Sequence, residues 1–359
     1  MSTDSFNEAD TRIGGKRPAL ARASAKLGLL PLMQAVRRAF RGDLRILAYH
    51  RVLDVDAETF DFDLALVSAS AAQFRAQMEY VKKRYRPMRF HDVIEHLDAG
   101  RALPADAVIV TFDDGYDDNY RIAYPILRDI GMPATFFVST GHIDSGRPYA
   151  YDWLVHMIVT TPAPRVELPE LNVEFELAPS RRARAALAAD LLDRLKWLDD
   201  DQQGALIARL ENVWSMPRAP HPDCRPMNWD QLREMQAGGM EIGSHGVHHR
   251  MLARLRNAQM LAEVADSKAA LERELGVRAE VLSYPVGGTN AFGADVIAAL
   301  RAQNFRIGCS YISGSNQLPL RDLYALRRLP VEQYIDQDWF RGMLVWPELF
   351  SHRSRQRTG

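Results

Sequence analysis

Two adjacent carboxylates, Asp113 and Asp114, follow the apolar run AVIVTF at 107–112 and precede Gly115. Active sites of α/β proteins form at the carboxyl ends of their strands, so the pair is a candidate for acid–base or metal chemistry. An Asp-Gly pair is equally typical of a simple turn. An EF-hand calcium loop is excluded because position 12, counted from Asp113, is Tyr124 rather than Glu.

Two histidines four residues apart, His245 and His249, follow a second short apolar run at 240–243. This spacing can bring two imidazoles to one side of a turn, which is a common arrangement of metal ligands. Such pairs are also common as ordinary surface or core histidines. The neighbours of His248 do not mark it as a ligand.

A third strand end, Tyr284-Pro285-Val286-Gly287, is by itself only a loop signal. Combined with the other two, it indicates a site. One Asp and two His form a three-ligand set that leaves positions open for water and substrate, as in catalytic metal centres. The second Asp is then available as a base toward bound water.

The elements that position these residues alternate between short apolar runs and amphipathic helices, which predicts an α/β fold with a parallel sheet or barrel. Strands are expected at 44–49, 107–112, 134–138, 240–243, 281–284 and 305–309. Helices are expected at 72–85, 91–99, 119–130, 229–237, 258–275 and 293–303.

Three segments lie outside this alternation. Residues 1–42 form a basic leader, interpreted either as a tail with one surface helix or as a peripheral contact with an anionic membrane through Leu29, Leu30, Leu32 and Met33. Residues 150–225 are expected to be a helical insertion in a domain spanning 43–335, and 336–359 a C-terminal helix with a basic tail. In the insertion, Asp152 and Trp153 suit sugar binding, but packing is the favoured interpretation of Trp153.

Composition excludes several classes of protein. The 359 residues include 45 Lys and Arg against 46 Asp and Glu, so the basic surplus of a nucleic-acid-binding protein is absent. Cys224 and Cys309 show no CxxC spacing, which argues against a disulfide framework. We find no apolar run of the ~18–20 residues that span a bilayer and no secretory signal pattern, and we expect a cytoplasmic protein.

The ordered motifs TFDDG at 111–115, SHGVH at 244–248 with His249, and YPVG at 284–287 resemble the polysaccharide deacetylase family, also called the NodB-homology domain or carbohydrate esterase family four. The flanking segments LAYHRV at 47–52 and PILRDIGMPATFFVSTG at 125–141 resemble the branch found with bacterial exopolysaccharide genes. The resemblance extends from about Leu44 to Val331, apart from the insertion.

This resemblance implies a distorted (β/α) barrel of about seven strands and a hydrolase that removes N-acetyl groups from an amino sugar in a glycan or its lipid-linked precursor. It implies that Asp114, His245 and His249 bind a divalent metal, with zinc expected and cobalt or nickel as alternatives. It assigns Asp113 as the general base, and the backbone N–H of Val286 as an oxyanion donor.

Two departures from the family pattern are visible. Many members place an Arg before the Pro-containing turn, where it holds the catalytic Asp, and this chain has Ser283 there. Many members also have a late His as general acid, and none occurs here after Val331 except His352 in the basic tail, which we reject. His50 is the candidate for the missing acid or for a substrate contact; a structural histidine is the alternative. A sugar-binding remnant without turnover and a deformylase or other amide hydrolase remain alternative functions.

Overall fold

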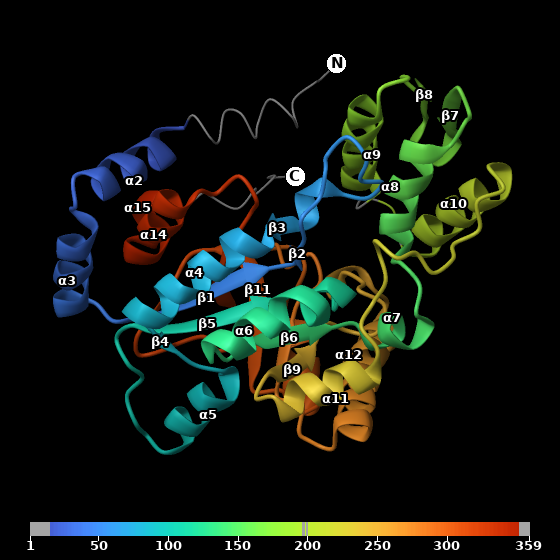
Figure 1. Cartoon of the computed structure of the whole chain (residues 1–359). Coiled ribbons are helices and arrows are strands. Elements are labelled where there is room, and N and C mark those ends of the chain that lie inside the picture. Colours follow the sequence, from blue (N-terminus) through green and yellow to red (C-terminus); the bar gives the residue numbers. More distant parts are fainter. Residues whose placement is uncertain (1–14, 196–197, 199, 352–359) are drawn as a thin grey trace.

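The structure is a computed structural model that describes residues 15–195, 198 and 200–351, and its centre is a closed barrel of parallel strands (Figure 1). Five parallel pairs from Arg45–Val108 to Tyr49–Phe112 join the first and last strands and close the barrel. The predicted seven-strand barrel is therefore confirmed. Around the barrel the order is β1 (Asp43–Tyr49), β13 (Leu326–Pro330), β11 (Ile307–Ser313), β10 (Val281–Ser283), β9 (Glu241–Ser244), β6 (Thr135–Val138) and β5 (Ala107–Phe112).

Side chains of the barrel strands alternate between the interior and the surrounding helices, as the period of two requires. Leu44, Ile46 and Ile109 belong to one buried apolar cluster with residues of the facing strands. Leu47 and Val110, of opposite parity, belong to the larger cluster shared with the helices. Every second residue of a strand faces the interior. At the carboxyl ends of the strands the interior positions are therefore Asp113 after β5, Ser283 on β10 and Arg328 on β13.

Helices cover the outside of the barrel (Figure 1). The predicted helix at 119–130 begins as one π turn, Asn119–Ala123, before it continues as α6. The other five helices predicted on the barrel lie within one residue of their expected bounds. The helices are α4 (Ala71–Arg84), α5 (Phe90–Asp98), α6 (Tyr124–Ile130), α7 (Thr140–Ser145), α11 (Trp229–Ala237), α12 (Asn257–Leu275) and α13 (Ala294–Ala302).

All six predicted strands are present, but β13 was not predicted. Its sequence LRRLP contains two arginines and ends in proline, so it lacks the apolar run that marks a buried strand. Short strands were also not predicted: β4 (Arg86–Pro87) beside β5, β12 (Asn316–Gln317) antiparallel to β1, and the pair β2 (Arg51–Val52) and β3 (Val67–Ala69).

The insertion packs around an apolar cluster of its own, to one side of the barrel (Figure 1). Trp153 belongs to this cluster and donates a hydrogen bond from Nε1 to the Met216 carbonyl at 2.9 Å, which favours the packing interpretation. The insertion consists of α8 (Ala150–Thr160), the hairpin β7 (Arg165–Leu168) and β8 (Val173–Glu176), α9 (Arg181–Leu195) and α10 (Asp200–Val213).

The basic leader contains two helices rather than the single surface helix expected, α2 (Lys16–Lys26) and α3 (Leu30–Phe40). Both lie against the C-terminal helices α14 (Gln337–Val345) and α15 (Pro347–Phe350) (Figure 1). The beginning of the leader, 1–14, and the tail containing His352 lie outside the described residues. Within the described part, no helix is both long and apolar enough to span a membrane.

Candidate active site

The predicted ligand set comes together at the carboxyl ends of β5 and β9. The Asp114 Oδ1 atom lies 3.4 Å from His245 Nε2 and 3.3 Å from His249 Nε2. One coordinating atom from each of the three residues lies within 4.8 Å of the others. The loops turn sharply here. Asp114 and His249 have backbone φ values of 76° and 58°, a region that residues other than glycine rarely adopt.

The spacing of these atoms fits a metal ion. Two ligand atoms bound to zinc at 2.0–2.1 Å with tetrahedral angles lie about 3.3 Å apart, close to both measured separations. Asp114 Oδ1 is buried and has no hydrogen-bond donor among the described residues. A buried acceptor without a donor is costly unless a cation satisfies it, so the geometry and the chemistry of the ligands agree.

The surrounding structure fixes the orientation of His245. Its Nδ1 lies 2.7 Å from the Ser283 carbonyl oxygen, so Nδ1 must carry the proton and Nε2 is left facing Asp114. Metal-bound histidines commonly make this second contact. The Ser139 hydroxyl and the amide of Gly141 donate to the His245 and Val247 carbonyls, which ties the loop to the start of α7.

Glu263 of α12 holds the same loop from the other side. Its carboxylate accepts hydrogen bonds from the backbone amides of Val247 and His248 at 2.7 and 3.0 Å, and from His248 Nδ1 at 2.6 Å. The Glu263 side chain is 4% exposed. His248 therefore points to Glu263 and not to the ligand set, as its exclusion predicted.

Arg328 holds the expected base, Asp113. Its Nη1 and Nη2 atoms donate to Asp113 Oδ1 and Oδ2, each at 2.7 Å, in a two-pronged pair that is buried inside the barrel. Nη2 also donates to the Ser283 hydroxyl at 2.9 Å. Asp113 is therefore held by an arginine although Ser283 occupies the family's arginine position, because the guanidinium comes from β13 instead of β10.

Charge in the site follows from these contacts. Burial acts to raise the pKa of Asp113, but Arg328 opposes it, helped by His245 and His50, and the pKa lies below its ordinary value. Burial also acts to raise the pKa of Asp114, and the His249 and His245 imidazoles bring it well below that value. Both carboxylates are thus ionised at neutral pH, which favours a cation beside them.

Val286 lies in a turn anchored to β11. The Tyr284 amide donates to the Cys309 carbonyl at 2.9 Å, and the Tyr311 amide donates to the Gly287 carbonyl at 2.7 Å. A Cβ on Gly287 would lie 2.5 Å from the Tyr311 nitrogen, so only glycine fits there. Val286 has a φ of 65°, an outlier for a β-branched residue. Its role as an oxyanion donor stays a prediction.

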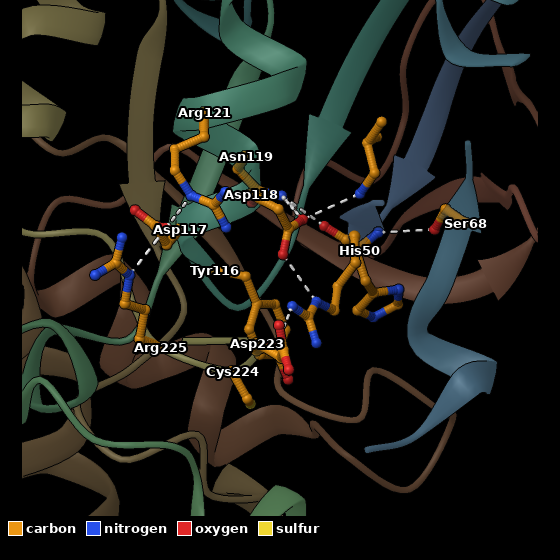
Figure 2. Close-up of polar contacts among 12 residues, drawn as sticks. His50, Ser68, Tyr116, Asp117, Asp118, Asn119, Arg121, Asp223, Cys224 and Arg225 are labelled. Carbon is orange, nitrogen blue, oxygen red and sulfur yellow. Dashed lines mark hydrogen bonds and ion pairs between the residues drawn. The ribbon is translucent and has the colours of Figure 1, made fainter. Parts of the chain in front are cut away.

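His50 is held near the two carboxylates by its backbone. Its amide donates to the Ser68 hydroxyl at 2.9 Å and its carbonyl accepts from Asn119 Nδ2 at 2.8 Å (Figure 2). Its ring lies 5.4 Å from that of Tyr311, and it is near enough to help lower the pKa of both Asp113 and Asp114. The structure thus places His50 beside the site, while its role stays a prediction.

The acidic run after Asp114 forms structural pairs around this position (Figure 2). Asp118 accepts from Arg51 Nε at 2.8 Å and from the Val52 amide at 3.1 Å. Asp117 pairs with Arg121 and Arg225. Arginines thus satisfy these two carboxylates, in agreement with the exclusion of a calcium loop.

Tyr149 and Tyr151, where the barrel meets the insertion, form an aromatic wall beside the site that no sequence motif indicated. The Tyr149 hydroxyl donates to the Asp114 carbonyl at 2.9 Å. The rings of Tyr149 and Tyr151 lie 5.4 and 5.3 Å from the His249 ring. Asp152, the suggested sugar contact, is instead buried and accepts from the Tyr116 hydroxyl at 2.8 Å.

Arg328 and Glu263 were also missed, although each left a signal. In the strand LRRLP, Arg328 is two residues after Leu326 and so lies on the same, interior side. Glu263 lies on the same helical face as Met260, Ser267 and Leu271, all of which are buried. A charged residue at a buried position needs a partner, so each could have been flagged. The partner itself is 215 residues away from Arg328, and only the closed barrel reveals it.

Comparison with known proteins agrees with this geometry. The family model described as polysaccharide deacetylase matches residues 100–307, more than half of the chain. The chain belongs to the polysaccharide deacetylase family. The match includes Asp113, Asp114, both ligand histidines and the turn at Val286, while His50 and Arg328 lie outside it.

Individual relatives are distant. The Bacillus subtilis (strain 168) protein YxkH, a polysaccharide deacetylase by name, is 22% identical over 263 residues, which cover 72% of this chain and 64% of YxkH. The poly-beta-1,6-N-acetyl-D-glucosamine N-deacetylase of Escherichia coli (strain K12) is 31% identical over 91 residues, which cover 25% of this chain and 13% of that enzyme. The match therefore spans less than two thirds of either relative.

Solved structures share the fold. IcaB from Ammonifex degensii superimposes with a TM-score of 0.54 at 20% identity, covering 87% of this chain and 99% of that chain. Streptococcus pyogenes deacetylase PplD, solved in complex with acetate, gives a TM-score of 0.54 at 18% identity, covering 82% and 95%.

Proposed function

We propose that this member of the family is a metal-dependent hydrolase that removes N-acetyl groups from an amino sugar within a polysaccharide or its lipid-linked precursor. The observation that supports it most is the combination of an Asp–His–His set, whose ligand atoms lie within 4.8 Å of one another, with a second, arginine-held carboxylate beside it. A metal-binding or sugar-binding protein without turnover needs the first feature and has no use for the second.

Asp114, His245 and His249 would hold the ion, and zinc fits the separation of Asp114 Oδ1 from each histidine. A divalent ion there would polarise the acetamide carbonyl and lower the pKa of bound water. Cobalt and nickel accept the same ligands, so availability decides among the three.

The residues of the chain supply the proton transfers. Asp113 takes a proton from water as the water oxygen attacks the acetyl carbon, and Arg328 keeps that carboxylate ionised and correctly oriented. The Val286 amide donates to the carbonyl oxygen as negative charge develops on it. His50 donates a proton to the amine nitrogen as the C–N bond breaks. The products are acetate and a free amino sugar.

Acetate release tests this proposal. Purified protein supplied with zinc is incubated with N-acetylglucosamine oligosaccharides, linked either β-1,6 or β-1,4, and acetate is measured enzymatically. We expect acetate from at least one series. Formate release from N-formyl sugars, without acetate from any N-acetyl sugar, supports the deformylase alternative, and tight glycan binding without turnover supports the sugar-binding remnant.

The role of His50 is tested by His50→Gln. We expect turnover to fall about 100-fold while zinc content is unchanged, because general acid catalysis typically contributes 10²–10⁴-fold. His91→Gln on the exposed face of α5 is the control. Unchanged turnover in His50→Gln would instead assign His50 a structural role.

A further inference from the structure

The outward face of α3 is largely apolar, the reverse of an ordinary surface helix. On α3 the side chains of Leu32, Val36 and Phe40 are 64%, 42% and 87% exposed, and Leu29 just before it is 43% exposed. Alanines 35 and 39 are also exposed and fill the same side. The opposite side, with Leu30, Gln34 and Arg37, is buried.

These exposed residues form one continuous stripe. At 100° per residue, positions 29, 32, 36 and 40 fall within a sector of about 80° on the helix. Leu20 on α2 and Leu27 just after it are also exposed, at 45% and 73%. Single exposed apolar residues need no explanation, but a stripe along the whole of α3 marks an interaction surface.

Basic residues border this surface. Residues 11–42 contain eight Lys and Arg and no Asp or Glu. Some of these arginines are committed to the protein: Arg37 and Arg41 pair with Asp43 and Glu348. Lys16 and Lys26 have exposed side chains, and Arg38 stays 49% exposed beside Asp106.

A second element adds positive charge independently of the leader. Gln34 of α3 donates a hydrogen bond to the Arg84 carbonyl at 3.4 Å, which brings the end of α4 against α3. That end has the run Lys82, Lys83 and Arg84, and all three side chains are exposed. Lys83 and Arg84 thus add positive charge beside α3, where Gln34 of its buried side makes the contact, while Lys82 Nζ donates to the Ile130 carbonyl.

We propose that α2 and α3 dock this protein on an anionic phospholipid surface, with Leu27, Leu29, Leu32, Val36 and Phe40 entering the interface and the surrounding bases near the headgroups. An amphipathic helix with an apolar face and basic flanks binds such surfaces in this way. Leu30 and Met33, named from the sequence as contacts, face the protein instead and belong to or pack against its core.

Docking would also orient the active site. Helix α3 leads into the beginning of β1, whereas the ligand set lies at the carboxyl ends of β5 and β9. In Figure 1, α3 and the insertion next to the aromatic wall lie on opposite sides of the molecule. The site would then open away from the bilayer, toward a glycan that extends from the surface.

Vesicle co-sedimentation of the full chain tests the proposal without depending on catalysis. The probes are vesicles of phosphatidylcholine alone and with 30% phosphatidylglycerol, at about 0.05 and 0.3 M NaCl. We expect binding to the anionic vesicles that weakens at high salt, with at least tenfold weaker binding to phosphatidylcholine.

Two variants and a matched control locate the surface. The double variant Leu32→Ser with Phe40→Ser should weaken binding at least tenfold, and Lys83→Glu with Arg84→Glu about 25-fold or more, since each base near the surface contributes about fivefold. The control is Leu261→Ser with Val277→Ser, because these side chains are 44% and 49% exposed but lie at α12 and just after it.

Three results would overturn the proposal. They are absence of binding to anionic vesicles at low salt, equal binding to both vesicle types, and a dimer in sedimentation velocity that Leu32→Ser with Phe40→Ser dissociates. The last result would assign the stripe to a second copy of the chain. Loss of acetate release would bear only on the proposed function, since none of the substituted residues lies in the site.

Discussion

At the scale of single residues, the central feature is that Arg328 reaches Asp113 by passing beside the small side chain of Ser283. The guanidinium from β13 contacts both Asp113 oxygens and the Ser283 hydroxyl. Ser283 is small, which leaves room for the arginine of the neighbouring side of the barrel. An arginine at position 283 and one at 328 would therefore compete for the same carboxylate.

Arg328→Lys should lower acetate release about 10- to 100-fold while the protein remains folded. Lysine keeps the positive charge but cannot make the planar two-pronged contact that orients Asp113. The measurement is kcat together with thermal stability. Arg327→Lys, on the exposed side of the same strand, is the matched control.

A compensating exchange sharpens this test. Arg328→Ser alone leaves Asp113 as a buried, unpaired charge, which costs about 3–5 kcal/mol of stability. Adding Ser283→Arg should restore part of both stability and turnover. A double variant no better than Arg328→Ser would show that the arginine must come from β13.

At the scale of elements, the loop between β9 and α12 depends on Glu263. Its carboxylate accepts both the Val247 and His248 amides, and that segment joins the two ligand histidines. Burial acts to raise the pKa of Glu263, but His248 and the two amides bring it below its ordinary value, so the group is ionised at neutral pH.

Glu263→Gln should weaken zinc binding about 10- to 100-fold, as loss of contacts that orient ligands typically does, and excess zinc should restore turnover. The zinc affinity of each protein is measured by competition with a chelating dye. Asp266→Asn, exposed on the same helix, should bind zinc like the unmodified protein. Equal affinity in Glu263→Gln would mean that the loop holds its shape without this carboxylate.

The insertion also has a buried acid whose ionisation opposes folding. Burial raises the pKa of Asp152 to about 7, against the ordinary 3.8, although the Tyr116 hydroxyl opposes the shift. The folded state therefore binds this proton more tightly than the unfolded state. The free energy of unfolding should fall as pH rises from about 4 to about 7 and then level off.

Asp152→Asn removes this dependence, because an amide does not ionise. Relative to the unmodified protein, the variant should gain stability between pH 5 and pH 8, on the order of a few kcal/mol. Urea unfolding at both pH values measures the gain, with exposed Asp190→Asn as the control. A stability difference that is the same at pH 5 and pH 8 would contradict the assignment.

At the scale of the whole molecule, short apolar runs separated by amphipathic helices predicted the central parallel strands, and the family resemblance implied that they close into a barrel. The approach of Asp114, His245 and His249 to one another was predictable too, since they stand at strand ends in family order. Arg328 and Tyr149 were not, because their roles depend on contacts across the barrel and with the insertion that no local pattern encodes.

The assembled site should couple metal binding to stability of the whole chain. Zinc bound only to the folded state, at 100 times its dissociation constant, adds about 2.7 kcal/mol. We expect zinc to raise the melting temperature of the unmodified protein and of Asp113→Asn, but not that of His245→Ala. A similar rise in His245→Ala would place the zinc elsewhere.

The most direct test compares the unmodified protein with Asp113→Asn for zinc content and for acetate release from N-acetylglucosamine oligosaccharides. We expect one zinc ion per chain in both proteins and acetate release reduced about 10²- to 10⁴-fold in the variant. Acetate release by Asp113→Asn at the rate of the unmodified protein, or undiminished release after zinc is removed by a chelator, would contradict the proposed function.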